Sequence, residues 1–182
     1  MTTREVTAVK LSIVFLGIFL LMALLPFSES SGQPANIPDE ATAKTLDGKK
    51  ASLADHRGKL IFLNIWKTDC KACLYEIPIL NRIQKEYASE HFTVIGIAMD
   101  RGKDKYVGEL VQMADIDYPI WLGYGQPIAQ YVDVALTPVI FFIAPDGRTI
   151  GFRVGAFLSY EEAAATVRHI QKRLAEQKDG QS

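Results

Sequence analysis

The two cysteines of the chain are the residues best suited to chemistry. Cys70 and Cys73 are the only cysteines among 182 residues, and two residues separate them. At this spacing on the first turn of a helix, two sulfurs can form a disulfide, and the helix N-terminus favours a thiolate on the first cysteine. Cys70 can then attack a disulfide, and Cys73 is placed to resolve the resulting mixed disulfide. The pattern predicts a redox-active pair.

Two other uses of the cysteine pair remain open. One is a fixed structural disulfide, although a loop this short gains little from being closed. The other is a metal site, with a copper-binding thiol module as the candidate from a different functional class. The three histidines, His56, His91 and His169, are scattered along the chain and are expected at the surface, so we predict no metal and no cofactor. Leu74 follows Cys73, so the CxxCH haem attachment motif is absent.

Composition limits the kinds of partner. The chain has 20 Lys and Arg residues against 21 Asp and Glu, a formal net charge of −1, which gives no basic field for nucleic acid. Hydrophobic residues make up 48% of the chain and charged residues 23%, which is typical of a folded protein with a sizeable core. The length suits one domain and an additional segment.

The additional segment is at the N-terminus. Residues 11–27 carry no charge and as a helix would span roughly 25 Å, just under a hydrocarbon core of about 30 Å. Arg4 and Lys10 precede this run and acidic residues follow it, so residues 1–10 are expected in the cytoplasm and the rest of the chain outside. The sequence predicts a single-pass membrane anchor.

The alternative for the same segment is a cleaved signal peptide, with residues 28–30 (Ser-Glu-Ser) as the cleavage site. The protein would then be a soluble periplasmic one. Residues 28–40 are rich in Ser, Pro and Gly and are predicted to form a linker. Residues 41–182 are predicted to form one domain.

Hydrophobic patterning within 41–182 alternates between strands and helices. A hairpin is predicted at 43–52, and Ser159 with Glu162 makes a capping box for a last helix. Further strands are predicted at 60–66, 93–99, 139–144 and 149–154, and helices at 71–90, 103–114 and 126–132. This order predicts an α/β domain with a mixed β-sheet and helices on both faces.

Around the cysteines, residues 63–78 (LNIWKTDCKACLYEIP) resemble the active-site signature of the TlpA/ResA-type thioredoxin-like proteins, extracytoplasmic thiol-disulfide oxidoreductases that are often membrane-anchored. Thr137-Pro138 ahead of a late strand extends the resemblance, which covers about 41–174. It implies a thioredoxin-like fold, a central mixed β-sheet flanked by helices with an N-terminal β-hairpin addition, here preceded by a transmembrane helix.

The resemblance also implies roles for individual residues. Cys70 would be the attacking thiol and Cys73 the resolving one, together forming the redox-active disulfide. Glu76, one turn beyond Cys73, would exchange protons near the dithiol, against the alternative of a solvated surface glutamate. Thr137 and Pro138 would form a cis-proline loop that binds a substrate strand.

Four more positions are interpreted through the same family. Trp66 is expected to line the active-site surface, with a core aromatic as the alternative. Asn64 stands where cytosolic thioredoxins have a buried acid, as is usual for the extracytoplasmic branch. Asp69 and Ala72 depart from the family, which usually has Trp or another uncharged residue and often proline at these positions. The departures affect reduction potential and partner choice rather than the class of reaction.

Together these features predict an extracytoplasmic protein-disulfide reductase. By the resemblance, its substrates are disulfides in exported proteins, with apocytochrome c as the first candidate in a cytochrome c maturation-type role, and a membrane thiol reductant restores the dithiol. The alternative within the same chemistry is a disulfide oxidant or isomerase. The membrane is contacted through the N-terminal helix, and no nucleic acid is expected.

Overall fold

Strand β3 (Leu60–Trp66) lies at the centre of the sheet, and all of its seven residues are buried. A near-continuous apolar run is stable where both faces of the strand are covered. β3 pairs in parallel with β4 (Phe92–Ala98) and antiparallel with β6 (Val139–Ile143). Each of these three strands begins and ends within one residue of its predicted position.

The computed structural model describes residues 36–88, 91–132 and 134–179. The predicted anchor at 11–27 and most of the predicted linker at 28–40 lie outside these ranges. Within the ranges described, no helix combines the length and the apolar character that crossing a bilayer requires.

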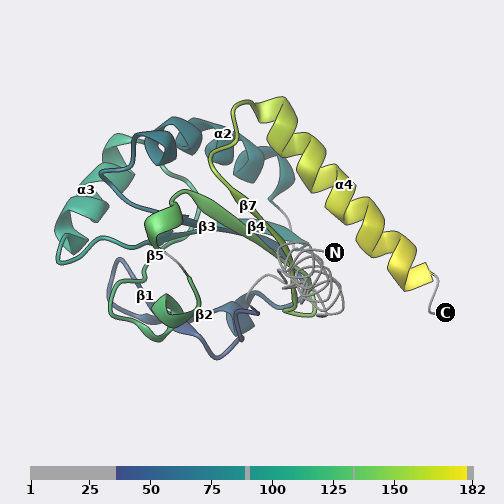
Figure 1. Ribbon diagram of the computed structural model, residues 1–182, viewed down its shortest axis with the longest axis horizontal. Helices are drawn as coiled ribbons and strands as arrows, with labels where there is room; N and C mark the ends of the chain where they lie inside the picture. The colour runs from purple at the N-terminus through teal and green to yellow at the C-terminus, as the bar shows by residue number, and fades with distance from the viewer. Residues whose placement is uncertain (1–35, 89–90, 133, 180–182) are drawn as a thin grey trace, which may run out of the picture. The chain divides into compact units, whose positions relative to one another are not determined.

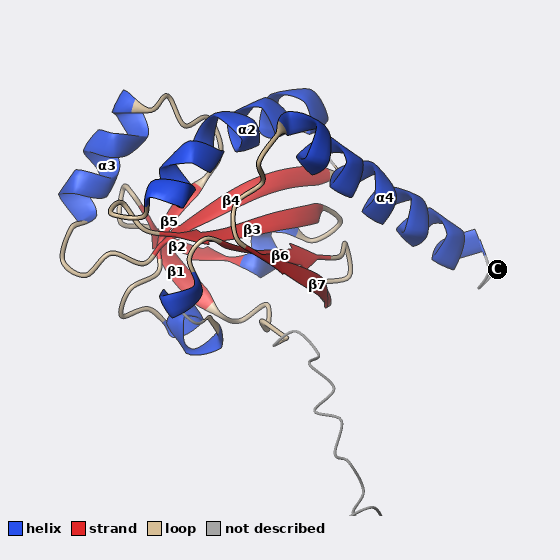
Figure 2. Ribbon diagram, turned by 45° about the horizontal axis from the view of Figure 1, so that its top comes forward, coloured by secondary structure: helices blue, strands red, loops and turns tan. Residues whose placement is uncertain are grey.

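The sheet has seven strands in the order β2-β1-β5-β4-β3-β6-β7 (Figure 2). The two parallel pairs, β3 with β4 and β4 with β5, lie in the middle, and the remaining pairs are antiparallel. The sheet is therefore mixed, as predicted. The other strands are β1 (Thr42–Thr45), β2 (Lys50–Ser52), β5 (Ile120–Leu122) and β7 (Thr149–Val154).

The α-helices α2 (Lys71–Tyr87), α3 (Asp104–Met113) and α4 (Tyr160–Asp179) all cover one face of the sheet (Figures 1 and 2). The opposite face is covered by the segment ahead of β1, with Ile37 and Ala41, and by short 3-10 helices. Helices on both faces were predicted, but the second face has only these single turns. The predicted helix at 126–132 is one of them, a 3-10 helix at Pro127–Tyr131.

Alternation along β3 divides the core into two clusters. Phe62 and Trp66 pack beneath the α-helices, whereas Ile61, Leu63 and Ile65 pack on the opposite face. Phe62 is fully buried and lies against three other aromatic rings, with centroid distances of 5.3, 4.8 and 6.3 Å to Phe92, Phe142 and Phe157. The larger cluster therefore connects β3, β4 and β6 with the segment ahead of α4.

Two local details differ from what the sequence predicts. β5 was not predicted, because three residues carry too little periodicity and the strand exists only by pairing with β1 and β4. At the start of α4, Ser159 Oγ accepts a hydrogen bond from Glu162 N at 3.2 Å, as a capping box requires. The Glu162 carboxylate, however, accepts from Leu158 N at 3.0 Å instead of closing the box on Ser159.

We expect Phe62→Ala to lower the free energy of unfolding by about 3–5 kcal/mol, because it leaves a cavity among the four rings. Phe152→Ala is the matched control: Phe152 is 47% exposed on β7, so its loss should cost about 1 kcal/mol or less. Urea unfolding of the full chain measures both values. Equal losses in the two variants would contradict the described core.

Candidate active site

Cys70 and Cys73 are joined by a disulfide at the N-terminus of α2. Cys70 is the N-cap residue of the helix, and its Sγ accepts a hydrogen bond from Cys73 N at 3.1 Å. Cys73 is 1% exposed, whereas Cys70 is only partly buried. An incoming sulfur can therefore reach Cys70 and not Cys73, which is the asymmetry that an attacking and a resolving cysteine require.

The turn between β3 and α2 positions the cysteine pair. Thr68, within this turn, donates hydrogen bonds from two groups to the buried carboxylate of Asp100. Its backbone N–H is shared between the two carboxylate oxygens, at 3.1 and 3.2 Å, and its hydroxyl lies 2.6 Å from Oδ1. Asp100 follows β4, the parallel neighbour of β3, so the carboxyl ends of both strands meet here. Asp100 was not singled out from the sequence, although its place after a buried parallel strand was a usable signal.

Asp69, the charged residue next to Cys70, is balanced by two lysines. Its carboxylate oxygens lie 3.8 Å from Lys67 Nζ and 3.7 Å from Lys103 Nζ. Lys103 Nζ also lies 3.9 Å from Asp100 Oδ1, which places it between the exposed and the buried carboxylate. The charge that departs from the family pattern therefore does not act alone on the neighbouring sulfur.

Glu76 is fully buried on α2, one turn beyond Cys73. Its Oε1 accepts a hydrogen bond from Phe157 N at 2.6 Å, and its Oε2 has no hydrogen-bond partner among the described residues. Burial raises the pKa of this carboxyl from 4.5 to about 7, against the opposing effects of the Phe157 N–H and the positive charge of Arg153. Glu76 is therefore not a solvated surface residue, and it titrates near neutral pH.

Other buried polar groups lie on the same face of the sheet. Asn64 Oδ1 and Trp66 Nε1 are buried without hydrogen-bond partners in the part of the chain that the structure describes. Burial raises the pKa of Tyr118, and the charge of Glu76 adds to the rise, which places this hydroxyl near the carboxyl. The space under α2 thus holds a cluster of polar groups in an otherwise apolar core.

The predicted place of Trp66 on the active-site surface is wrong. Its side chain is 1% exposed and belongs to the core cluster under the α-helices. The physical reason is strand alternation, because Trp66 shares the face of β3 that α2 covers. Gly96 on β4 gives the indole room: a Cβ at this position would lie 3.1 Å from Trp66 Nε1 and 2.5 Å from Ile120 Cδ1. The alternative, a core aromatic, describes Trp66 in this structure.

The Thr137–Pro138 peptide bond is cis. Pro138 is buried, and its carbonyl accepts a hydrogen bond from Gly155 N at 2.9 Å. Val139, the next residue, pairs with Ile65 near the end of β3. The proline loop therefore lies at the end of the sheet from which the chain continues to the cysteines, and the structure brings the two motifs to the same edge.

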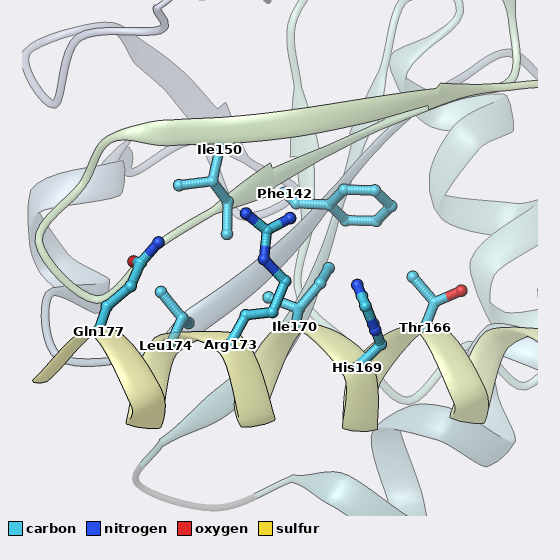
Figure 3. Close-up of a pocket in the computed structure, with 8 residues that line it drawn as sticks. All are labelled: Phe142, Ile150, Thr166, His169, Ile170, Arg173, Leu174 and Gln177. Atoms are coloured by element: carbon cyan, nitrogen blue, oxygen red, sulfur yellow. The ribbon is translucent and has the colours of Figure 1, made fainter. Parts of the chain in front are cut away.

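The histidines lie away from this edge. His169 borders a pocket of about 240 Å³ formed by β6, β7 and α4, and no residue of the cysteine turn lines that pocket (Figure 3). His91 is exposed, whereas His56 is half-buried with its ring 5.7 Å from that of Trp121, so the expectation of a plain surface residue does not hold for His56. Within the described ranges, no group of three or more His, Cys, Asp or Glu residues is placed to hold a metal ion.

Proteins similar to this chain include thiol-disulfide oxidoreductases. Residues 34–150 match the AhpC/TSA family. The thiol-disulfide oxidoreductase ResA of Bacillus thuringiensis is 34% identical over 105 residues, which are 58% of this chain and 60% of that protein. The chain thus spans about three fifths of the length of the ResA proteins to which it is similar.

Solved structures of other proteins share the fold. A thioredoxin-family thiol:disulfide interchange protein from Chlorobium tepidum aligns with a TM-score of 0.64 and 29% identity over 77% of this chain and 98% of that one. A secreted disulfide oxidoreductase from Mycobacterium tuberculosis aligns with a TM-score of 0.61 and 25% identity over 70% and 94%. These matches confirm the predicted thioredoxin-like fold and the resemblance to ResA-type proteins. Since the family match covers more than half of its residues, the chain belongs to the AhpC/TSA family.

Proposed function

We propose that the protein is an extracytoplasmic thiol-disulfide oxidoreductase that reduces disulfides in exported proteins. The observation that carries the proposal is the Cys70–Cys73 disulfide with one accessible and one buried sulfur, one helical turn from a buried carboxyl that titrates near neutral pH. The names of similar proteins, thiol-disulfide oxidoreductase and thiol:disulfide interchange protein, support the same chemistry.

The reaction proceeds in two exchange steps. The Cys70 thiolate attacks a substrate disulfide, which forms a mixed disulfide and releases one substrate sulfur as thiolate. Cys73 then attacks Cys70 Sγ: the Cys70–Cys73 bond forms, the bond to the substrate breaks, and the second substrate sulfur leaves as thiolate. The substrate gains two electrons and the cysteine pair loses two.

Glu76 acts in the second step. Cys73 is buried, so bulk water does not reach its thiol and a nearby group must take the proton before the sulfur can attack. Glu76 lies three residues further along α2 and therefore on the same side of the helix. Its Oε2 makes no hydrogen bond to the described residues and is the atom that can accept this proton. A pKa of about 7 suits a group that both takes up and releases protons at neutral pH.

Thr137 and Pro138 bind the substrate in this proposal. The segment ends next to the cysteine turn at the edge of the sheet, where an extended substrate strand can form backbone hydrogen bonds beside Cys70. Trp66 is left out of the substrate site because it is buried.

A reductase must itself be re-reduced. An exported compartment has no reducing thiol pool on which to depend, so a membrane thiol reductant supplies the electrons. Apocytochrome c is the proposed substrate, by the resemblance to TlpA/ResA-type proteins. The opposite direction of electron flow, a disulfide oxidant or isomerase, uses the same residues and differs in reduction potential.

The proposed location rests on the N-terminal sequence. Residues 11–27 form a single-pass anchor, residues 1–10 remain in the cytoplasm, and the domain at 41–182 is extracytoplasmic, joined by a linker at 28–40. The similarity to a secreted disulfide oxidoreductase supports export. If the segment is instead cleaved as a signal peptide, the domain is soluble in the periplasm.

Trapping tests the proposed function directly. We expect Cys73→Ala to accumulate partners bound to Cys70 through mixed disulfides, because the resolving thiol is missing, and mass spectrometry of the purified adducts identifies these partners. Cys70→Ala is the matched control and should trap none, since Cys73 is buried. Absence of adducts, together with a reduction potential near the oxidant's value of about −120 mV rather than thioredoxin's value of about −270 mV, would contradict a reductase.

The titration of Glu76 predicts a pH-dependent stability. Between pH 4.5 and about 7 the folded protein holds a proton on Glu76 that the unfolded chain has released, so the free energy of unfolding falls as pH rises through this range. The full change from this group is about 3 kcal/mol. Urea unfolding of the oxidised protein should show Glu76→Gln gaining stability relative to the original chain by this amount between pH 4.5 and 7.5. A constant difference across the range would exclude the raised pKa.

Topology is tested with two reporters fused after Ser182. Alkaline phosphatase, which folds only outside the cytoplasm, should be active, and a cytoplasmic reporter should be inactive. Deletion of residues 1–27 serves as the control and should reverse both results. Activity of the cytoplasmic reporter on the full chain would refute export.

A further inference from the structure

The loop between β7 and α4 supplies the hydrogen bond that holds Glu76. Phe157 N donates to Glu76 Oε1 at 2.6 Å across 81 positions of sequence. Phe157 is fully buried, whereas its neighbour Leu158 is 70% exposed. Burial therefore holds only part of this loop. Further contacts to its backbone are needed to keep the Phe157 N–H at Glu76.

An ion pair provides those contacts. Arg153 Nη2 lies 2.8 Å from Glu162 Oε1, and the same guanidinium donates to Ala156 O at 3.1 Å. Its Cζ also lies 4.6 Å from the centre of the Phe157 ring. The other carboxylate oxygen of Glu162 accepts from Leu158 N at 3.0 Å. Every residue from 156 to 158 is thus held by one member of the pair.

Both members of the pair also act on Glu76 by charge. The positive charge of Arg153 favours ionised Glu76, and the negative charge of Glu162 disfavours it. Among the described residues, Tyr118, ahead of β5, is a further titratable group that interacts with this carboxyl. Arg153 supplies the positive charge, and it comes from an edge strand far from the cysteine motif in sequence.

We propose that the Arg153–Glu162 ion pair is the positioning device of Glu76: it fixes the Phe157 N–H on Oε1 and leaves Oε2 to exchange a proton with Cys73. The proposal rests on the proposed thiol-disulfide exchange. The proton moves from Cys73 Sγ to Glu76 Oε2, the new sulfur–sulfur bond forms to Cys70, and the substrate sulfur leaves with the electron pair of the broken bond. Arg153 and Glu162 touch no reacting atom.

The test uses variants that separate charge from contact. Arg153→Gln removes the charge that favours ionised Glu76, whereas Glu162→Gln removes the opposing charge and keeps an oxygen that can accept from Leu158 N. Arg153→Lys keeps the charge and loses the guanidinium, whose Nη2 contacts both Ala156 and Glu162. Glu176→Gln, which breaks an exposed ion pair with Lys172 on α4, is the matched control.

Two readouts are measured on the full chain across pH 5–9. One is the rate at which Cys73 displaces glutathione from a Cys70–glutathione mixed disulfide; the other is the NMR titration of the Glu76 carboxyl carbon, identified by its absence in Glu76→Gln. We expect Arg153→Gln to raise both midpoints by at least about 0.5 pH unit and Glu162→Gln to lower them by a similar amount. Glu176→Gln should leave them unchanged.

Arg153→Lys separates positioning from charge. Because it retains the cation but loosens the loop, we expect slower displacement of glutathione at every pH with a midpoint close to that of the original chain. Midpoints that move in the same direction in Arg153→Gln and Glu162→Gln would indicate only a structural role and overturn the proposal, as would no movement in either variant. If Glu76→Gln itself leaves the rate and its pH profile unchanged, the proposed role of Glu76 fails instead. The NMR titration does not depend on activity, so the two failures are distinguishable.

Discussion

A strand buried on both faces requires cover on both faces, and β3 imposes this constraint on the whole fold. Three α-helices cover one face, and the segment ahead of β1 with short 3-10 helices covers the other. Alternation along the strand then decides which side chains lie under α2, and these include Asn64 and Trp66. The same strand leads directly into the turn that carries Cys70. The central strand of the sheet therefore also positions the disulfide, at the carboxyl end of that strand.

The space under α2 is more polar than packing requires. Asn64, Trp66 and Glu76 each keep one buried polar atom without a hydrogen-bond partner among the described residues. An unsatisfied buried polar atom costs about 1–3 kcal/mol. Apolar side chains of similar volume would avoid this cost, so packing alone does not explain three such groups in one region. The proposed proton exchange with the buried thiol would explain the carboxyl, since a solvated glutamate would remain ionised at neutral pH.

How far the sequence predicts this structure depends on the range of the contacts. The apolar run of β3 and the alternating run of β7 were located correctly because a strand's burial pattern is written in its own residues. The cysteine pair could likewise be identified locally, from its spacing and the residues around it. The burial of Trp66 and of Glu76 cannot be predicted in this way, because both depend on how α2 lies on β3. No local signal marks Arg153 or Phe157, which reach Glu76 only through the tertiary fold.

The effect of Asp69 also depends on a residue that is distant in sequence, Lys103. Seen in the sequence alone, a carboxylate beside Cys70 opposes its thiolate. In the structure, Lys67 and Lys103 lie within 4 Å of that carboxylate, and its side chain is 59% exposed to screening solvent. Its effect on the sulfur is therefore small. A charged cluster beside the more accessible sulfur of the disulfide can act on an approaching protein, because complementary charges steer encounter more than they change bond chemistry. In the proposed function, the departure thus bears on which partner reaches Cys70, and the reaction at the sulfur depends on the helix N-terminus and on Glu76.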